Sequence, residues 1–421
     1  MVGAGFAGFN AARTLYRRLR GSAEVVLVNP TDYFLYVPLL PEVTGGILDP
    51  RRVAVPLAAT LPDVRLAVGT AHDIDHSART VTYRDPDGRD QRLDYDHLLI
   101  TSGSVNKLLP IPGISEYAHG FRNLPEAVYL RDHLVRQVEL ADGADDEDER
   151  TARLTFVVVG AGYTGTEVVA QMQLLTHAVL SGHPRLAGVR PRWLLLDTAD
   201  RVLPGLRERL SHTAARTLAE RGVEVMTGTS VKEATADGVL LSDGTMVPTR
   251  SLIWCVGVRP DPLVETLGLP TDRGRLIVEP DLSVPGQPGM WACGDAAAVP
   301  DLTEPGQITA MTAQHAQRQG VTAGRNIAAA LGHGKARPYK HRDLGFVVDL
   351  GGYSAAADPL GVPLGGFPAK VVTRGYHLSA MPGNRARTAV DWTEHAVLGP
   401  ELQRLDLVDP AQVPLDTRPP S

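Results

Sequence analysis

The chain has 421 residues, of which 43% are hydrophobic and 21% are charged. This composition excludes a disordered or fibrous protein, and about 150 residues per domain predicts two or three domains. A formal net charge of -6 argues against a nucleic-acid-binding protein. Two cysteines and no HExxH or CxxC pattern exclude a disulfide scaffold and four-cysteine metal sites. We therefore expect a cytoplasmic enzyme without a metal site.

The first motif is a glycine-rich turn, Gly3-Ala4-Gly5-Phe6-Ala7-Gly8, followed by a helical pattern over 10–19 and a buried-strand pattern over 24–29. Such a GxGxxG turn joins a strand to a helix and holds the pyrophosphate of a dinucleotide at the helix N-terminus. Only two residues precede the turn, whereas a strand has about five. We expect the native start of the protein to lie upstream of Met1.

A second unit of the same kind begins with the apolar run 154–159, which is typical of a strand in a parallel sheet. It continues into Gly160-Ala161-Gly162-Tyr163-Thr164-Gly165, a helix over 166–181 and a strand over 193–197. Two such turns, each between strand and helix, predict two dinucleotide sites.

No run in the sequence approaches the roughly 18 to 20 consecutive apolar residues that a membrane-spanning helix needs.

Short strand patterns follow each unit in the same order, which predicts an internal duplication. We therefore expect an α/β protein with two Rossmann-like domains. The predicted strands are 65–68, 80–83 and 97–100 after the first unit, and 223–226, 251–254 and 276–278 after the second.

The residue that ends the second strand of each unit is expected to contact a ribose. Asp197 holds this place in the second unit, and its carboxylate would accept from the ribose hydroxyls and repel a 2′-phosphate, which favours NADH over NADPH. Arg201 lies four residues later and leaves NADPH open. Asn29 holds the place in the first unit, where an amide bonds a hydroxyl with less charge assistance than an acid.

The segment around Gly294-Asp295 resembles the GD motif of the two-dinucleotide flavin oxidoreductases. The runs 98–104 and 253–257 resemble the crossover segments of that group. The resemblance implies that FAD binds in the first unit and NADH in the second. The residues that it assigns to FAD are Gly3, Gly5, Phe6, Ala7, Gly8, Asn29, Thr101, Gly103, Gly294, Asp295 and Ala313, and those it assigns to NADH are Gly160, Gly162, Tyr163, Thr164, Gly165, Asp197 and Gly257.

Within that group the chain resembles the type II NADH dehydrogenases, through 32–46, 164–167 and an AQxAxQ-like segment at 312–320. This implies hydride transfer from NADH to FAD and two-electron transfer to a quinone without proton pumping, with Glu167, Gln314 and Gln317 as catalytic residues. Gln314 and Gln317 lie three apart on a predicted helix and share one face. The family often has an acid four residues after Glu167, where this chain has Gln171.

Two other functions stay open from the sequence. The same flavin core could reduce a soluble protein such as ferredoxin, or it could serve as a slow redox sensor, as Gln171, Asn29 and the divergent tail suggest. Thiol chemistry is not expected, because Cys255 and Cys293 fall inside apolar strand patterns and no cysteine lies where thiol-dependent relatives need one.

The resemblance predicts a split FAD domain over 1–123 and 270–345, an inserted NADH domain over 124–269 and a C-terminal region over 346–421. The tail mixes basic and aromatic residues with apolar ones. This composition suits peripheral docking on the inner face of the cell membrane, a homodimer contact or a tail that covers the core. Residues 409–421 are rich in proline and read as a loose end. The tail residues considered for docking are Lys370, Arg374, Tyr376, Arg385, Arg387, Trp392, Val371, Val372, Leu378 and Met381.

Overall fold

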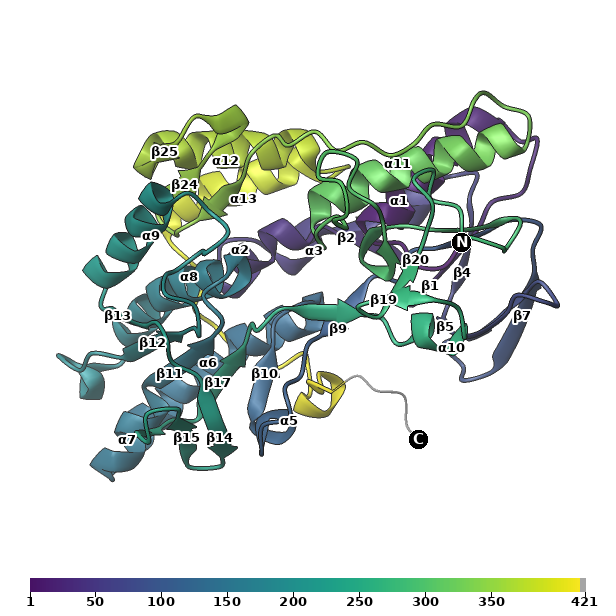
Figure 1. The fold of residues 1–421 in the computed structure, drawn as a ribbon. Helices are drawn as coiled ribbons and strands as arrows, with labels where there is room; N and C mark the ends of the chain where they lie inside the picture. The colour runs from purple at the N-terminus through teal and green to yellow at the C-terminus, as the bar shows by residue number, and fades with distance from the viewer. Residues whose placement is uncertain (417–421) are drawn as a thin grey trace. The chain divides into compact units, whose positions relative to one another are not determined.

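The computed structural model describes residues 1–416 and divides them into two compact units, each assembled from separate stretches of chain (Figure 1). Unit 1 contains Met1–Leu35, Ala54–Val105 and Val258–Arg342, and unit 2 contains Tyr36–Val53, Asn106–Gly257 and the described residues from Asp343 on. Along the chain the units change at 35/36, 53/54, 105/106, 257/258 and 342/343. The FAD and NADH domain boundaries at 123/124 and 269/270 stay a prediction. Within residues 1–416, no helix has the length and apolar character needed to cross a membrane.

Unit 1 is built on parallel strands around the first glycine turn. Val2 forms single parallel bridges to Val28 of β1 and to Ile100 of β8, so it stands where the first strand of the unit belongs. β1 pairs with β4 and β8 pairs with β21, all in parallel, which gives the spatial order β4, β1, Val2, β8, β21. The strands are β1 Val26–Asn29, β4 Arg65–Val68, β8 Leu98–Ile100 and β21 Met290–Ala292.

Two helices of unit 1 pack closely. Helix α1 (Phe6–Leu19) places Ala7, Ala11 and Leu15 in the core, and α11 (Ala313–Ala330) runs beside it (Figure 1). A side chain at Gly320 would place its Cβ only 2.1 Å from the Ala7 carbonyl oxygen. This glycine lets the two helix backbones approach.

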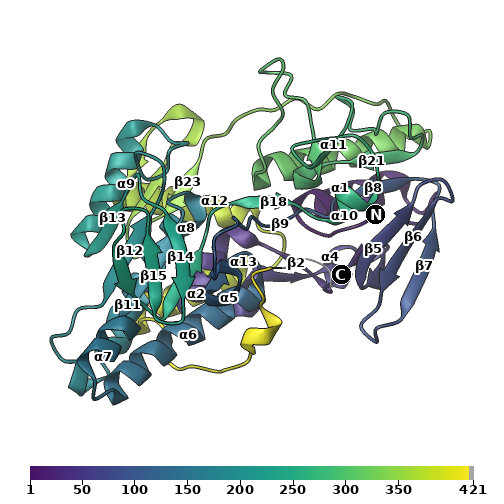
Figure 2. The same cartoon turned by 60° about the horizontal axis from the view of Figure 1, so that its bottom comes forward.

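The remaining elements of unit 1 are short, and they include the antiparallel sheet β5-β6-β7 (Figure 2). They are β2 Tyr33–Leu35, β3 Ala54–Pro56, α4 Leu57–Thr60, β5 Thr70–Asp75, β6 Thr80–Arg84, β7 Asp90–Asp94, β18 Val258–Pro260, α10 Leu263–Thr266, β19 Thr271–Asp272, β20 Arg275–Ile277 and β22 Ala297–Ala298. Strand β9, Ser104–Asn106, contains the division between the units.

Unit 2 repeats the plan with a five-stranded parallel sheet in the order β13, β12, β11, β17, β10. It also has an antiparallel sheet, β14-β15-β16, at the corresponding place in the chain. The predicted α/β class and the duplication are confirmed. The strands are β10 Ala118–Gly120, β11 Thr155–Val159, β12 Arg192–Leu196, β13 Val223–Met226, β14 Val231–Thr235, β15 Gly238–Leu241, β16 Met246–Pro248 and β17 Ser251–Trp254.

The main helices of unit 2 pack around this sheet and against the segment 36–53. Helix α6 begins with a capping box in which Asn123 and Glu126 bond each other's backbone amides. The helices are α2 Leu40–Thr44, α3 Pro50–Val53, α5 Ile114–Tyr117, α6 Leu124–Gly143, α7 Glu147–Arg153, α8 Tyr163–Leu180 and α9 Glu208–Glu220.

The C-terminal region belongs to unit 2. It forms a small sheet of β23 (Val347–Asp349), β24 (Ala355–Ala357) and β25 (Leu364–Gly365), followed by helices α12 (Gly366–Ala380) and α13 (Arg385–Leu398). The helices are separated at Pro382-Gly383-Asn384, as the sequence indicated.

Several tail residues that we considered for surface docking are buried. Lys370, Met381 and Trp392 are 2%, 0% and 5% exposed. They are buried because α12 and α13 cover the segment 36–53. The Trp392 indole donates to Glu42, and Arg52 forms an ion pair with Asp391 at 2.8 Å.

The predicted loose end is largely exposed but contains one residue of the core. Leu415 is 2% exposed and joins the core cluster of unit 2 that contains Leu194 and Trp254. Residues 417–421 lie outside the described residues.

Replacing Trp392 by Phe tests whether the tail is structural. The change removes the indole N–H that serves the buried Glu42 carboxylate, so we expect the free energy of unfolding to fall by about 1–3 kcal/mol in denaturant titrations. Val397→Ala is the control, because Val397 is 77% exposed and its loss should change the unfolding free energy by less than about 0.5 kcal/mol. Equal effects of both variants would contradict a structural role for α13.

Candidate active site

The turn of unit 1 depends on glycine at two positions. Gly3 has φ +93°, and a Cβ there would lie 2.3 Å from the Thr101 carbonyl oxygen. A Cβ on Gly8 would lie 1.9 Å from the Gly3 carbonyl oxygen. At Gly5, by contrast, a Cβ would meet no described protein atom within 4 Å. Backbone amides at the start of α1 are therefore approachable, which suits the phosphates of a dinucleotide.

The turn of unit 2 has the same geometry. Gly160 has φ +105°, and its Cβ would lie 2.3 Å from the Cys255 carbonyl oxygen. A Cβ on Gly165 would lie 1.9 Å from the Gly160 carbonyl oxygen, whereas one on Gly162 would meet no described atom within 4 Å. The two turns therefore repeat each other position by position, and both fit a dinucleotide.

The strand-end residues reach these turns. Asn29 Oδ1 accepts a hydrogen bond of 2.8 Å from the Ala4 amide, and Asp197 Oδ2 accepts one of 2.6 Å from the Ala161 amide. Asp197 Oδ1 also accepts from Ala199, at 2.8 Å. Both side chains therefore fix the turn backbone, and this places them at the edge where a ribose would follow the pyrophosphate.

The first crossover segment, 98–104, and the GD motif meet in unit 1. Thr101 Oγ1 lies 2.8 Å from the carbonyl oxygens of both Val2 and Gly3, and Ser104 donates to Asp295 Oδ2 at 2.6 Å. Gly294 has φ +74°, and its Cβ would come within 3.0 Å of Ala7. The structure thus brings Gly294 and Asp295 to the first glycine turn, as an FAD site requires.

Gln319 has a positioning role that we did not predict. Its Oε1 accepts from the Gly294 amide at 2.8 Å, and its amide donates to Thr309 at 2.9 Å. Its side chain is 1% exposed. The signal in the sequence was the extra glutamine two residues after Gln317.

The other predicted residues lie on the same elements. Phe6 packs edge-on against Phe34 with ring centroids 5.0 Å apart. Gly103 and Gly257 have φ +81° and +97° and open surroundings, so both crossovers turn through a left-handed glycine. Tyr163 and Thr164 are exposed at the start of α8, with the Tyr163 ring 5.6 Å from that of Phe346.

Helix α11 begins at Ala313 and is capped by Thr312, whose hydroxyl accepts from the His315 amide at 3.3 Å. Gln314 and Gln317 are both half-buried near this N-terminus. Aligning AQxAxQ on Ala313 puts its last position at Arg318 and not at Gln317. Arg318 donates to the Arg342 carbonyl oxygen.

Unit 2 contains a buried charged cluster, which we define as Glu42, Asp349 and Lys370 together with the half-buried Glu167. Lys370 Nζ lies 2.5 Å from Asp349 Oδ2 and 3.8 Å from Glu42 Oε1. The Asp349 amide donates to Glu167 Oε1 at 2.8 Å. Lys370, Glu42 and Asp349 are 2%, 2% and 7% exposed. Three carboxyl groups thus share one buried ammonium, and this favours proton retention within the cluster.

The protonation states follow from this imbalance. Burial is the main cause that raises the pKa of Glu167 to about 8. The hydrogen bond from the Asp349 amide opposes this rise, and the charges of Asp349 and Glu42 add to it. Burial and the Asp349 charge also raise the pKa of Glu42 above its ordinary value. Glu167 is therefore largely protonated at neutral pH, and it holds a proton close to the second glycine turn.

Of this cluster, only Glu167 was expected from the sequence. The other members come from segments distant in the chain and carry no local motif. A usable signal was the helical spacing of Lys370, Thr373 and His377, which are all buried on one face of α12.

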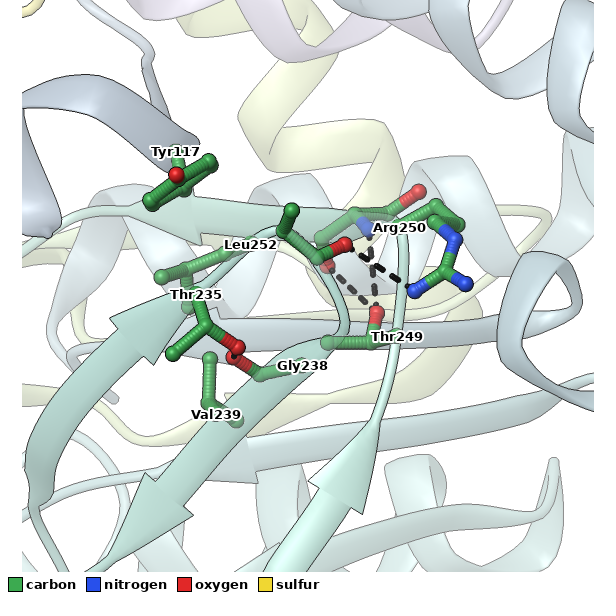
Figure 3. A pocket seen from close by; sticks show the side chains of 9 residues that line it. Tyr117, Thr235, Gly238, Val239, Thr249, Arg250 and Leu252 are labelled. Atoms are coloured by element: carbon green, nitrogen blue, oxygen red, sulfur yellow. Dashed lines mark hydrogen bonds between the residues drawn. The ribbon is translucent and has the colours of Figure 1, made fainter.

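The structure also contains a small cavity of about 90 Å³ beside β14–β16, lined by residues including Tyr117, Thr249 and Arg250 (Figure 3). Thr249 and Arg250 already bond the Thr155 and Ala236 carbonyl oxygens. None of the predicted site residues lines this cavity, so it is separate from the candidate site.

The raised pKa of Glu167 predicts a pH dependence of stability. The folded state binds this proton more tightly than the unfolded chain, whose value is near 4.5, so the free energy of unfolding should fall as pH rises from about 4.5 through about 8. Denaturant titrations across this range should show a flatter dependence in Glu167→Gln. The control Glu208→Gln, at an exposed residue of α9, should keep the parent slope. An unchanged slope in Glu167→Gln would refute the assignment.

Comparisons with known proteins agree with this architecture. Residues 1–320 match the family described as pyridine nucleotide-disulphide oxidoreductase. The chain is 30% identical to the type II NADH:quinone oxidoreductase Ndh of Mycobacterium tuberculosis over 408 residues, 93% of this chain and 86% of that protein. It is also 30% identical to the demethylphylloquinone reductase NdbB of Synechocystis, covering 91% of each chain.

The comparison with solved structures agrees with the fold. The structure of NDH2 from Plasmodium falciparum in complex with NADH matches 96% of this chain and 98% of that one, with a TM-score of 0.88 at 17% identity. The resemblance inferred from the sequence motifs is confirmed. The chain belongs to the pyridine nucleotide-disulphide oxidoreductases and, within them, to the type II NADH:quinone oxidoreductases.

Proposed function

We propose that this protein is an FAD-dependent NADH dehydrogenase that passes two electrons to a quinone. The observation that carries the proposal is the twofold glycine turn, open at Gly5 and at Gly162. A chain with two such turns can hold two dinucleotides, and the GD motif beside the first turn supports FAD as the ligand of unit 1. Asp197 beside the second turn favours NADH. Bound FAD supplies the ring system that accepts a hydride and releases two electrons.

The residues of the chain bind and orient these groups. Gly3, Gly5 and Gly8, together with Ala7, Asn29, Thr101 and Asp295, form the FAD side, while Gly160, Gly162, Gly165 and Asp197 form the NADH side. The N-terminus of α11 carries partial positive charge from its free amides, which favours negative charge on a bound group. Gln314 and Gln317 can donate hydrogen bonds to quinone carbonyls without introducing a charge.

Glu167 serves as a proton-holding group in this proposal. Its Oε1 accepts from the Asp349 amide, and its raised pKa keeps a proton on the carboxyl at neutral pH. Quinone reduction consumes two protons, whereas a hydride brings only one. A carboxyl that is protonated at neutral pH can supply a proton without a metal or a thiol. Cys255 and Cys293 do not compete for this role, because burial raises the pKa of both thiols.

We further propose that the exposed face of α12 and α13 contacts the inner face of the cell membrane. Phe367, Val371, Val390, Val397 and Leu398 are each 56% to 77% exposed. Exposed apolar side chains in this number on adjacent helices are unusual for a surface in water. Arg385 and Arg387 are exposed on the same helix pair and suit anionic headgroups.

Absorption spectroscopy tests the enzymatic proposal. The purified protein should show a flavin spectrum that bleaches within seconds on adding NADH and returns on adding a menaquinone analogue. Gly5→Ala should lower the flavin content. Gly162→Ala should keep it but raise the NADH concentration needed for reduction by about tenfold or more, a loss of about 1.4 kcal/mol. A chain that stays colourless in excess FAD would overturn the proposal. Reoxidation of the flavin by ferredoxin but not by quinone would identify a soluble protein, and not a quinone, as the electron acceptor.

Vesicle flotation tests the membrane surface. The parent chain should float with vesicles rich in anionic lipid, and Val397→Asp/Leu398→Asp should abolish flotation because two charges would enter the apolar layer. Met246→Asp is the control, because Met246 is 53% exposed on β16 and should not affect flotation. If the double variant floats as the parent does, the surface is misassigned. A change of oligomeric state instead would assign these helices to a homodimer contact.

A further inference from the structure

Gln171 stands where the resembled family often has an acid, and its surroundings show what occupies that place. The side chain is 1% exposed, and its Nε2 donates to Asp349 Oδ1 at 3.2 Å. An amide carries no charge and cannot replace the missing carboxylate. The group that Gln171 contacts, however, is a carboxylate on another element, β23.

We infer that Asp349 supplies from β23 the carboxylate that α8 lacks at position 171, and that it is the positioning residue that orients Lys370 and keeps the proton on Glu167. This inference rests on the proposed function, because it assigns that proton a use in turnover. It adds a residue that neither the glycine turns nor the AQxAxQ-like segment points to.

The contacts of Asp349 support this role. Oδ1 accepts from Gln171 and, at 2.7 Å, from the Gly351 amide, while Oδ2 lies 2.5 Å from Lys370 Nζ. Its backbone amide donates to Glu167, which holds the two residues together; this bond by itself lowers the pKa of Glu167, whereas the Asp349 charge raises it. One residue thus connects α8, α12 and the turn after β23. A carboxylate held in this way has a fixed geometry, as a positioning residue requires.

The charges around Asp349 explain why its location affects Glu167. Lys370 lies closer to Asp349 than to Glu42, so the buried ammonium primarily stabilises the Asp349 carboxylate. Glu42 and Glu167 then keep their protons more readily. The other charged and titratable groups around the cluster are Arg374, which stacks on Trp392, Arg221, which bonds the Leu350 and Gly351 carbonyl oxygens, and His377, which burial keeps neutral by lowering its pKa to about 4.

Exchanging the carboxylate between the two positions tests the inference. Asp349→Asn removes the charge at nearly constant shape, and Gln171→Glu is isosteric and restores a charge across the same hydrogen bond. In Asp349→Asn we expect quinone-dependent kcat to fall by about tenfold or more and its pH profile to move to lower pH, because Glu167 loses a neighbouring negative charge. The double variant Gln171→Glu/Asp349→Asn should recover kcat to within about threefold.

A spectroscopic readout separates electrostatics from turnover. The infrared carbonyl band of a protonated carboxyl, assigned by its loss in Glu167→Gln, gives the titration midpoint of Glu167 directly. The midpoint should fall in Asp349→Asn and return in the double variant. Gln171→Glu alone should move it upward, and this variant keeps the test open if Asp349→Asn does not fold.

A matched control places the new acid elsewhere on the same helix. Gln173 is 4% exposed on α8 and bonds the Arg221 carbonyl oxygen instead of Asp349. Gln173→Glu/Asp349→Asn should recover neither kcat nor the midpoint. Equal recovery by both double variants, or recovery by neither while both fold, overturns the inference. If the parent chain fails to reduce quinone, the proposed function is wrong, and the infrared midpoints still decide whether Asp349 sets the proton affinity of Glu167.

Discussion

The close approach of the first and third glycines in each turn constrains the rest of this protein. The third glycine of each turn, Gly8 or Gly165, has no room for a side chain, because its Cβ would lie 1.9 Å from the carbonyl oxygen of Gly3 or Gly160. The contact fixes the angle at which strand passes into helix. The middle glycines, Gly5 and Gly162, have no described protein atom within 4 Å of a Cβ. One turn geometry therefore both joins strand to helix and leaves room for a ligand. The same contact is repeated in the second unit, between Gly160 and Gly165.

The second unit includes chain segments that lie far from its central sheet in the sequence. Residues 36–53 belong by sequence to the first copy of the duplication, yet they pack with the tail helices α12 and α13. The buried charged cluster lies within this assembly, because Glu42 comes from α2 and Lys370 from α12. Charge balance in the candidate site therefore depends on the C-terminal region, which stabilises the unit as well as covering it.

The parts of the fold that were predictable from sequence are those set by local chemistry. Continuous apolar runs such as 154–159 and the glycine spacing gave the strands, turns and duplication, because each depends on residues within one short segment. Lys370 and Trp392 show the opposite case. They looked like surface residues, since a cation and an indole near apolar residues suit a membrane face, but their buried partners Asp349 and Glu42 lie in distant segments. The place of Gln319 was missed for the same reason, because its partner Gly294 is contributed by another element.

Leu415 has a consequence for how the chain is made. This side chain enters the core of the second unit close to the end of the described residues. During synthesis the N-terminal end of the chain leaves the ribosome first. All strands of the parallel sheet of this unit therefore emerge well before Leu415. Full packing of the core cluster that contains Leu415 therefore requires this segment to have left the ribosome, and a nascent chain stalled before it would leave part of that core uncovered.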